Sequence, residues 1–409
     1  MHVIYIHQHF STRRGATGTR SYEMSRRLIA AGHRVTMICG AYGHGDLGDA
    51  GDGGAGVSEY DIDGIRVLRV AERYSNQMGF LRRVLAFGRF ARAAARLACG
   101  LDGDLVFATS TPLTVGMPGM KAARRLGVPF VFEVRDLWPE LPIALGVVRN
   151  PLVKAHLRRM ERRIYRAAHR IIALAPGIKE GICRTGFPAD RVEMIPNCSD
   201  LDLFRPTDEP LGDPRFGGPR DLKLVFTGAH GLANGLDAVL DAAALLKNRG
   251  EQGIRFVFIG EGGQRERLMC RSEREGLNAL ITWLPPMPKE ELAVVLPRMD
   301  AGMMILKNVP AFYYGTSPNK FFDYIACGLP VLNNYPGWLA DMIASNRCGL
   351  ALKPDDPEAF ADAVVWMRDH RPELKEMGRR ARELAEREFG RERLGDQFVC
   401  TLEEARASC

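Results

Sequence analysis

Short apolar runs alternate with longer amphipathic segments along almost the whole chain. The apolar residues within each run are continuous, which is typical of strands in a parallel sheet that is covered on both faces. Strands are predicted at 3–6, 35–39, 65–70, 105–108, 130–134, 171–175, 192–195, 222–226, 254–259, 281–284, 301–306, 330–332 and 349–352. Helical patterns such as 21–31 and 80–99 lie between them. This alternation predicts an α/β fold built from βαβ units with parallel sheets.

The length of the chain predicts two domains. Its 409 residues exceed the size at which a single core stops growing, roughly 250–300 residues. Residues 205–220 contain four prolines and several glycines, which exclude a helix or a central strand, so we predict the linker there. The expected domains are 1–204 and 221–389. A charged helix at 390–409 follows, and the sequence leaves open whether it packs back on the first domain.

Residues 42–64 are rich in Gly and Asp and hold few large apolar side chains. We expect a mobile loop here, at the end of the second strand, where such folds bind ligands. A role as a substrate lid and a role as a plain connection both remain open.

Composition and charge narrow the class of protein. A hydrophobic fraction of 46% and a charged fraction of 26% are ordinary for a soluble globular protein and exclude disorder of the whole chain. The net charge of +7 suits an anionic ligand or an acidic membrane surface. Nine scattered cysteines without a CxxC pair favour reduced thiols. We expect a cytoplasmic protein with at most peripheral membrane contact and no nucleic-acid partner.

Three predicted strand-to-helix junctions are rich in glycine, and glycine there lets backbone N–H groups approach an anion at a helix N-terminus. The residues that these junctions offer are Gly15, Gly18, Gly228, His230, Asn234, Gly235, Gly260, Glu261 and Gly262. None of the junctions matches GxGxxG or GxxxxGK[ST], which disfavours a dinucleotide oxidoreductase. Tight turns between strand and helix explain the glycines equally well.

The most specific stretch is 313–331, YYGTSPNKFFDYIACGLPV. Ser317 followed by Pro318 predicts the start of a helix, with Ser317 as the N-cap. Backbone N–H groups of Ser317 and Asn319 would then face an anion, and Lys320 adds a full positive charge. Asp323 lies one turn further on, where its carboxylate can accept hydrogen bonds from sugar hydroxyls.

This stretch resembles the donor-binding helix of retaining glycosyltransferases of family 4, which have the GT-B fold. On this chain the second acidic position of the family motif falls on Asp323, and the first falls on Gly315. The resemblance implies that Asp323 holds the nucleotide ribose and that Tyr314, Ser317 and Asn319 lie at the donor. The form Gly-x-Ser-Pro-x-Lys is similar to that of sugar-antigen transferases within the family.

Other stretches resemble the family in the same order along the chain. Residues 228–235 are similar to the glycine loop near the diphosphate, and 260–262 with Arg265 are similar to the loop that flanks the nucleotide. Residues 132–140 resemble the strand end that usually carries a His-Asp pair, here Arg135 and Asp136. The resemblance implies two Rossmann-like domains facing each other across a cleft. It also implies a nucleoside-diphosphate sugar, such as a UDP-sugar, as donor.

Transfer with retention needs stabilisation of the diphosphate leaving group, because negative charge builds up there. Fixed N–H dipoles with Lys320 or Arg265 would supply it without a metal or a further cofactor. We assign catalytic roles to Lys320, Arg265 and Asp136, and place Arg135 and Glu140 on the acceptor side. The acidic pairs at 61–63 and 200–202 are interpreted as structural.

Two helical patterns in the first half are strongly basic. Residues 81–98 hold five arginines and no acid, and 154–170 hold further arginines against one glutamate. Basic amphipathic helices would hold the chain on anionic lipid and bring it to a polyprenyl-diphosphate acceptor. A solvated helix face with its apolar side in the core is the alternative.

The predicted function is transfer of a hexose or N-acetylhexosamine to a glycan or a lipid-linked acceptor, in the synthesis of a cell-surface polysaccharide. The first alternative is a GT-B enzyme that is not a transferase, such as a nucleotide-sugar 2-epimerase, which would release its product without an acceptor. The second is a non-catalytic sugar-binding protein.

Overall fold

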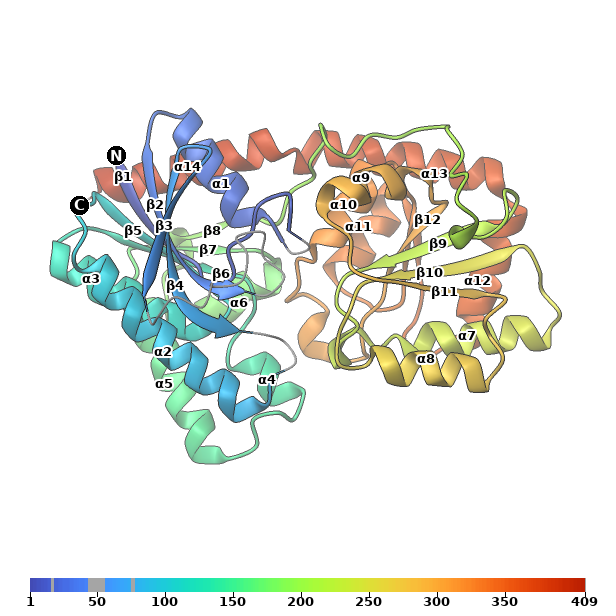
Figure 1. Cartoon of the computed structure of the whole chain (residues 1–409), viewed down its shortest axis with the longest axis horizontal. Coiled ribbons are helices and arrows are strands. Elements are labelled where there is room, and N and C mark those ends of the chain that lie inside the picture. Colours follow the sequence, from blue (N-terminus) through green and yellow to red (C-terminus); the bar gives the residue numbers. More distant parts are fainter. Residues whose placement is uncertain (16–17, 43–55, 75–77, 409) are drawn as a thin grey trace. The chain divides into compact units, whose positions relative to one another are not determined.

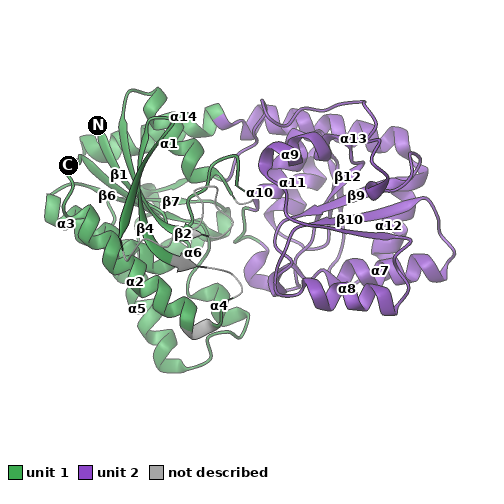
Figure 2. Cartoon of the chain, in the orientation of Figure 1, with its two compact units in different colours: residues 1–196, 314–317, 392–409 green, residues 197–313, 318–391 purple. Residues whose placement is uncertain are grey.

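The computed structural model describes residues 1–15, 18–42, 56–74 and 78–408, which form two compact units. The first unit comprises residues 1–196, 314–317 and 392–409, and the second comprises 197–313 and 318–391 (Figure 2). The chain therefore changes unit between residues 196 and 197, before the predicted linker. Residues 205–220 belong to the second unit, where Phe216 is 1% exposed and anchors them.

The first unit holds an eight-stranded sheet in the order β3-β4-β2-β1-β5-β6-β7-β8. Its strands are β1 (His2–Ile6), β2 (Arg34–Tyr42), β3 (Val57–Ile62), β4 (Ile65–Tyr74), β5 (Leu105–Thr109), β6 (Phe130–Val134), β7 (Arg170–Ala173) and β8 (Val192–Met194). All neighbours pair in parallel except β3 and β4. The predicted α/β class with a parallel sheet is confirmed for this unit.

Helices cover both faces of this sheet (Figure 1). They are α1 (Arg20–Ala30), α2 (Phe80–Ala98), α3 (Gly116–Leu126), α4 (Glu140–Ala144), α5 (Pro151–Ala167), α6 (Pro176–Arg184) and α14 (Arg391–Ala407). Helix α14 packs beside α1, where Arg27 Nε donates to Asp396 Oδ1 at 2.7 Å and His33 lies 2.9 Å from Glu403. Helix α3 lies between α2 and α5 on the other face.

The expectation of a loop over 42–64 is wrong for residues 57–62, which form the antiparallel edge strand β3. Residues 43–55 of that expectation lie outside the described residues. Asp63 and Gly64 both have positive φ, 51° and 82°, and close a tight hairpin to β4. The sequence pattern missed the strand because the segment is mostly polar, and an exposed edge strand is held by its backbone pairing with β4.

The second unit holds a six-stranded, fully parallel sheet in the order β11-β10-β9-β12-β13-β14. Its strands are β9 (Leu222–Thr227), β10 (Ile254–Ile259), β11 (Ile281–Leu284), β12 (Ala301–Met304), β13 (Val331–Asn333) and β14 (Gly349–Ala351). Its helices are α7 (Asp237–Asn248), α8 (Arg265–Arg274), α9 (Lys289–Val295), α10 (Asn319–Ala326), α11 (Trp338–Asn346), α12 (Pro357–Asp369) and α13 (Arg371–Leu384). Helices lie on both faces, so central strands such as β9 are buried throughout, as the continuous apolar runs predict.

In the part of the chain that the structure describes, no helix combines the length and apolarity required to cross a bilayer.

Candidate functional site

The carboxyl edge of the second sheet is where the fold places a ligand. Strand β9 connects to α7 and neighbours β10 on one side, whereas its other neighbour, β12, leads towards α10. The order of the strands reverses between β9 and β12. In open α/β sheets, ligands bind beyond the carboxyl ends of the strands at such a switch point. The loops after β9, β10 and β12 therefore form the candidate site.

The loops after β9 and β10 pack backbone against backbone. Gly228 N donates to Ile259 O at 2.9 Å, and His230 N donates to Glu261 O at 2.8 Å. A Cβ added at Gly260 would lie 2.0 Å from Gly228 O, so no side chain fits there. Gly260 also has a φ of +150°, which L residues rarely adopt. These glycines are therefore required by the close approach of the two loops.

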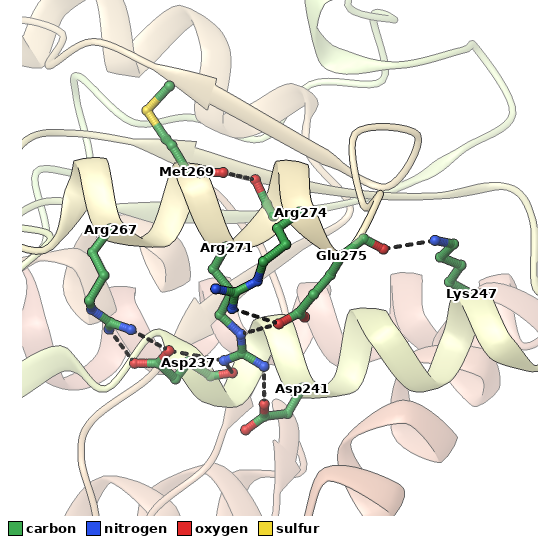
Figure 3. Close-up of polar contacts among 9 residues, drawn as sticks. Asp237, Asp241, Lys247, Arg267, Met269, Arg271, Arg274 and Glu275 are labelled. Carbon is green, nitrogen blue, oxygen red and sulfur yellow. Dashed lines mark hydrogen bonds and ion pairs between the residues drawn. The ribbon is translucent and has the colours of Figure 1, made fainter.

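Ion pairs between α7 and α8, the helices that follow these two loops, also hold the loops together. Arg271 of α8 contacts two carboxylates of α7: its Nη1 lies 2.9 Å from Asp237 Oδ1, and its Nη2 lies 2.5 Å from Asp241 Oδ1. Figure 3 shows Arg267 and Arg271 of α8 both directed at Asp237, the first residue of α7. Because each helix begins directly after its glycine loop, this network fixes the positions of the two helix N-termini.

Lys320 projects towards this edge from the first turn of α10. Its Nζ lies 3.4 Å from the centroid of the Phe226 ring and would be 3.5 Å from a Cβ at Gly228. Burial lowers the pKa of the Lys320 ammonium well below its ordinary value. Within the described residues, Lys320 has no hydrogen bond or ion pair, so no carboxylate neutralises it there. Its charge is thus available to an anion.

His230 and Arg265 complete a basic cluster around Lys320. The His230 ring is fully buried beside Phe226, and neither ring nitrogen has a hydrogen-bond partner in the described structure. Burial, followed by the charges of Arg265 and Lys320, lowers the pKa of His230 to about 4. Arg265 begins α8, and its Nε is also buried without a hydrogen-bond partner among the described residues. The structure therefore brings together three basic side chains that the sequence analysis proposed separately.

Asp323 lies on the buried side of α10, where it is 8% exposed. Its Oδ1 is 3.3 Å from Lys289 Nζ, and that ammonium stacks 5.3 Å from the Phe204 ring centroid. Burial raises the pKa of Asp323, although Lys289 opposes the shift. Lys289 was not identified from the sequence. It lies on α9, 34 residues before Asp323, and the residues around it form no recognisable motif.

The approach to α10 differs from the prediction. The helix begins at Asn319, and Pro318 takes the N-cap position with no side-chain cap. Its ψ of 128° is extended, so Pro318 cannot be the first helical residue and Ser317 cannot be the N-cap. Residues 314–317 pack in the first unit, where Gly177 N donates to Tyr314 O at 2.9 Å. The chain therefore passes from the first unit to the second between Ser317 and Pro318.

The remaining predicted donor residues are divided between the units. Asn234 Nδ2 donates to Ala229 O at 2.6 Å, and a Cβ at Gly235 would lie 2.8 Å from Lys307 Cα, so both shape the loop after β9. Gly15 and Gly18 belong to the first unit, after β1. Glu261 and Gly262 follow β10 in the second unit, and Asn319 is the first residue of α10 in the same unit.

The predicted acceptor-side residues follow β6 of the first unit. Arg135 Nε donates to Thr109 Oγ1 at 2.8 Å and lies 3.1 Å from Glu133 Oε1, so its guanidinium is held by the strand ends. Asp136 Oδ2 accepts a hydrogen bond from Thr111 at 3.4 Å, and burial raises the pKa of its carboxyl. Glu140 is exposed at the first position of α4.

A buried ion pair beneath these residues was missed by the sequence analysis. Arg20 Nε donates to Glu133 Oε2 at 2.9 Å, and both side chains are almost fully buried. The same guanidinium donates to the carbonyl oxygens of Ile195 and Pro196. Arg20 therefore ties α1 and β6 to the point where the chain leaves the first unit. No sequence signal pairs two residues that are 113 positions apart.

Gly260 allows a test of the loop geometry. We expect Gly260→Ala to separate the two glycine loops, to lower the stability of the second unit by about 1–3 kcal/mol and to weaken nucleotide binding. Gly263→Ala is the matched control, because nothing lies within 4 Å of a Cβ at Gly263. Thermal unfolding and calorimetric titration with UDP would measure both effects. If the two variants had the same thermal stability and the same UDP affinity, the close packing of the two loops at Gly260 would not be important for the site.

Two family models match the chain. Residues 15–198 match the glycosyl transferase 4-like domain, and residues 218–384 match the glycosyl transferases group 1 domain. A D-inositol 3-phosphate glycosyltransferase from Paenarthrobacter aurescens is 26% identical over 71% of this chain and 70% of its own length. A GDP-mannose-dependent alpha-mannosyltransferase from Mycobacterium tuberculosis is 27% identical over 75% of this chain and 74% of its own length. A D-inositol 3-phosphate glycosyltransferase from Corynebacterium jeikeium is 27% identical over 42% of this chain and 42% of its own length.

Solved structures show the same fold at low sequence identity. Sucrose-phosphate synthase from Thermosynechococcus elongatus superposes with a TM-score of 0.76 at 17% identity, with full coverage of both chains. Anabaena Alr3699/HepE in complex with UDP-glucose gives a TM-score of 0.69 at 15% identity, covering 99% of this chain and all of the other. WaaG, a glycosyltransferase involved in lipopolysaccharide biosynthesis, gives 0.65 at 14% identity, covering 98% and 99% of the two chains. The predicted GT-B class is confirmed.

Proposed function

Because the chain belongs to the family 4 glycosyltransferases with the GT-B fold, we propose that it transfers a sugar, with retention, from a nucleoside-diphosphate donor. The observation that carries this proposal is the basic cluster of His230, Arg265 and Lys320. The cluster lies at a topological switch point and has no hydrogen-bonded carboxylate within the described residues. A diphosphate is the anion that supplies the missing negative charge.

The same cluster supplies the chemistry of the transfer. When the bond between the sugar and the diphosphate breaks, negative charge develops on the leaving oxygen. Arg265 is a positive charge in a partly buried setting, and Lys320 becomes one when the bound diphosphate raises its pKa, so both stabilise the developing charge more than they would in water. Backbone N–H groups at the starts of α8 and α10 add to this effect. The oxygen of the acceptor hydroxyl forms the new bond to the sugar, and its proton passes to the departing diphosphate oxygen, so that the transfer balances with donor and acceptor.

Asp323 supports recognition of the nucleoside. We assign the ribose to this carboxylate, which Lys289 holds in one orientation from 3.3 Å away. We propose UDP as the nucleotide, because related structures are of complexes with UDP and UDP-glucose. A relative that uses GDP-mannose shows that the base varies among similar chains.

The first unit would receive the acceptor. Asp136, with its raised pKa and its hydrogen bond from Thr111, is placed to orient an acceptor hydroxyl, flanked by Arg135 and Glu140. We propose a glycan or a polyprenyl-diphosphate-linked acceptor at the inner face of the cytoplasmic membrane, in cell-surface polysaccharide synthesis. The likeness to a transferase of lipopolysaccharide biosynthesis supports this proposal.

A product assay tests the function. The protein is incubated with UDP-linked hexoses and N-acetylhexosamines, and with GDP-mannose, with and without a polyprenyl-diphosphate-linked sugar. We expect UDP release that depends on the acceptor, and a product with α configuration from an α-linked donor. Release of a free sugar or of an epimer without acceptor would instead identify the epimerase alternative. Turnover of GDP-mannose alone would refute UDP as the donor nucleotide.

A further inference from the structure

A large groove opens on the helical face of the first unit, away from the residues at the carboxyl edge. It has a volume of about 1580 Å³, and its lining comes mainly from α2, α3 and α5. Figure 1 labels these three helices. The groove lies entirely within residues 88–191, so a single unit forms it. Neither the predicted donor residues nor the acceptor residues line it.

The lining of the groove carries positive charge only. Its charged side chains are Arg92, Arg96, Lys121, Arg124, Arg163, Arg166 and Arg191, and no aspartate or glutamate accompanies them. Only Arg191 of these has a hydrogen bond or ion pair within the described residues, to the carbonyl oxygens of Ala168 and His169. Six cations therefore surround one hollow with no carboxylate to neutralise them.

Surface arginines on α8 and α13 are arranged differently. On α8, Arg267 and Arg271 are each bonded to Asp237, and Arg271 also contacts Glu275 (Figure 3). On α13, Arg379 pairs with Glu376. In contrast to α8 and α13, the groove gathers uncompensated charges of α2, α3 and α5 in one hollow, and these charges create a field that attracts an anion.

Most of the remaining lining is apolar, and Thr114, His156 and His169 are its polar members. Met117, Met120 and Met160 line the groove together with prolines and alanines, and methionine adapts its shape to flexible apolar ligands. Apolar side chains are also exposed near the N-terminal ends of two of the same helices: Leu85 on α2 is 59% exposed and Leu152 on α5 is 78% exposed. A site that is both cationic and apolar fits an amphipathic anion.

We propose that this groove binds the phosphate-bearing headgroup of an anionic phospholipid and so docks the first unit on a bilayer surface. The cations contact the phosphate, and the exposed leucines of α2 and α5 enter the interface between headgroups and acyl chains. A single-stranded nucleic acid fits less well, because its bases stack on exposed Phe, Tyr or Trp side chains. Phe130 is the one such residue in the lining, and it is 3% exposed. This inference specifies how the protein contacts the membrane, and it rests on the proposed function.

Co-sedimentation with vesicles tests the site. The intact chain is mixed with vesicles of phosphatidylcholine alone, and with vesicles of equal parts phosphatidylcholine and phosphatidylglycerol. We expect binding to the second kind only. The double variant Arg163→Gln with Arg166→Gln should lower the vesicle partition coefficient roughly 25-fold, since each cation near an anionic surface contributes about a factor of five.

The matched control lies on the same helix. Arg158 and Arg162 are exposed on α5 but do not line the groove, so Arg158→Gln with Arg162→Gln removes the same charge from a different face. This control should retain most of the binding. Equal losses in the two double variants would overturn the groove as a site and leave only a general electrostatic attraction.

Two further measurements separate the inference from the proposed function. UDP titration should be unchanged in the groove variant, so loss of vesicle binding with intact UDP binding supports the groove alone. If the wild-type chain ignores phosphatidylglycerol but still binds UDP, the groove proposal fails and the transferase proposal stands. Groove-dependent binding of a single-stranded RNA in place of vesicles would also overturn it.

Discussion

Lys320→Met is expected to reduce the kcat/KM of sugar transfer by about 100- to 1000-fold, while the protein remains folded. Methionine keeps the apolar stem that packs on Phe226 but removes the charge that faces the leaving diphosphate. Because the ammonium has no hydrogen bond or ion pair among the described residues, its removal leaves no group of the chain without a partner. The melting temperature should therefore stay the same or rise. Steady-state kinetics and thermal unfolding of the same preparation check both statements.

Lys353→Met serves as the control, since Lys353 is an exposed lysine of the same unit. It should leave turnover and UDP affinity unchanged. Normal activity in Lys320→Met would contradict the assignment of the leaving-group site, whatever the donor sugar proves to be.

The lowered pKa of Lys320 also predicts a pH dependence of binding. Burial lowers the pKa in the free protein, and a bound diphosphate raises it. A group whose pKa rises on binding takes up a proton. UDP affinity is therefore greatest below the pKa of the free protein and falls as the pH rises towards the pKa of the complex. Calorimetry in buffers of different ionisation enthalpy should detect the proton uptake, and Lys320→Met should abolish it.

Arg20→Met is expected to lower the free energy of unfolding by about 3–5 kcal/mol, because it leaves the buried Glu133 without its main counter-ion. The carbonyl oxygens of Ile195 and Pro196 lose their donors as well. Urea denaturation followed by circular dichroism measures the loss. Arg125→Met, an exposed position on α3, should change stability by less than about 0.5 kcal/mol.

The stabilisation that comes from the Arg20–Glu133 pair should depend on pH. Burial alone would raise the pKa of Glu133, but Arg20 and Arg135 outweigh it and hold the pKa below the ordinary 4.5. The stabilisation is therefore present above pH 4.5 and is lost as the pH falls through the lower pKa of the folded state. The difference between wild type and Arg20→Met should shrink in acid. Adding Glu133→Gln to Arg20→Met should recover part of the loss, and a purely additive double variant would contradict a coupled pair.

The candidate donor site was predicted in large part from local patterns. Glycines at strand ends and the stretch 313–331 identified the loops after β9, β10 and β12, and the structure brings His230, Arg265 and Lys320 together there. These patterns are readable because each depends on neighbours in sequence: a turn needs glycine where it occurs, and a helix starts at its own first residues. The assigned roles of the residues remain predictions that the experiments above decide.

The continuous apolar runs were sufficient to predict a parallel sheet in each unit, because a strand buried on both faces must be continuously apolar and that pattern is local. The antiparallel hairpin strand β3, the change of unit after residue 196 and the partners of the buried charges became visible only in the packed structure. The Arg20–Glu133 and Lys289–Asp323 pairs join residues far apart in the chain, and many other arginines, lysines and acids offered equally plausible partners. The pairing of buried charges depends on which side chains the packed elements bring within a few ångströms, and local sequence carries no record of that distance.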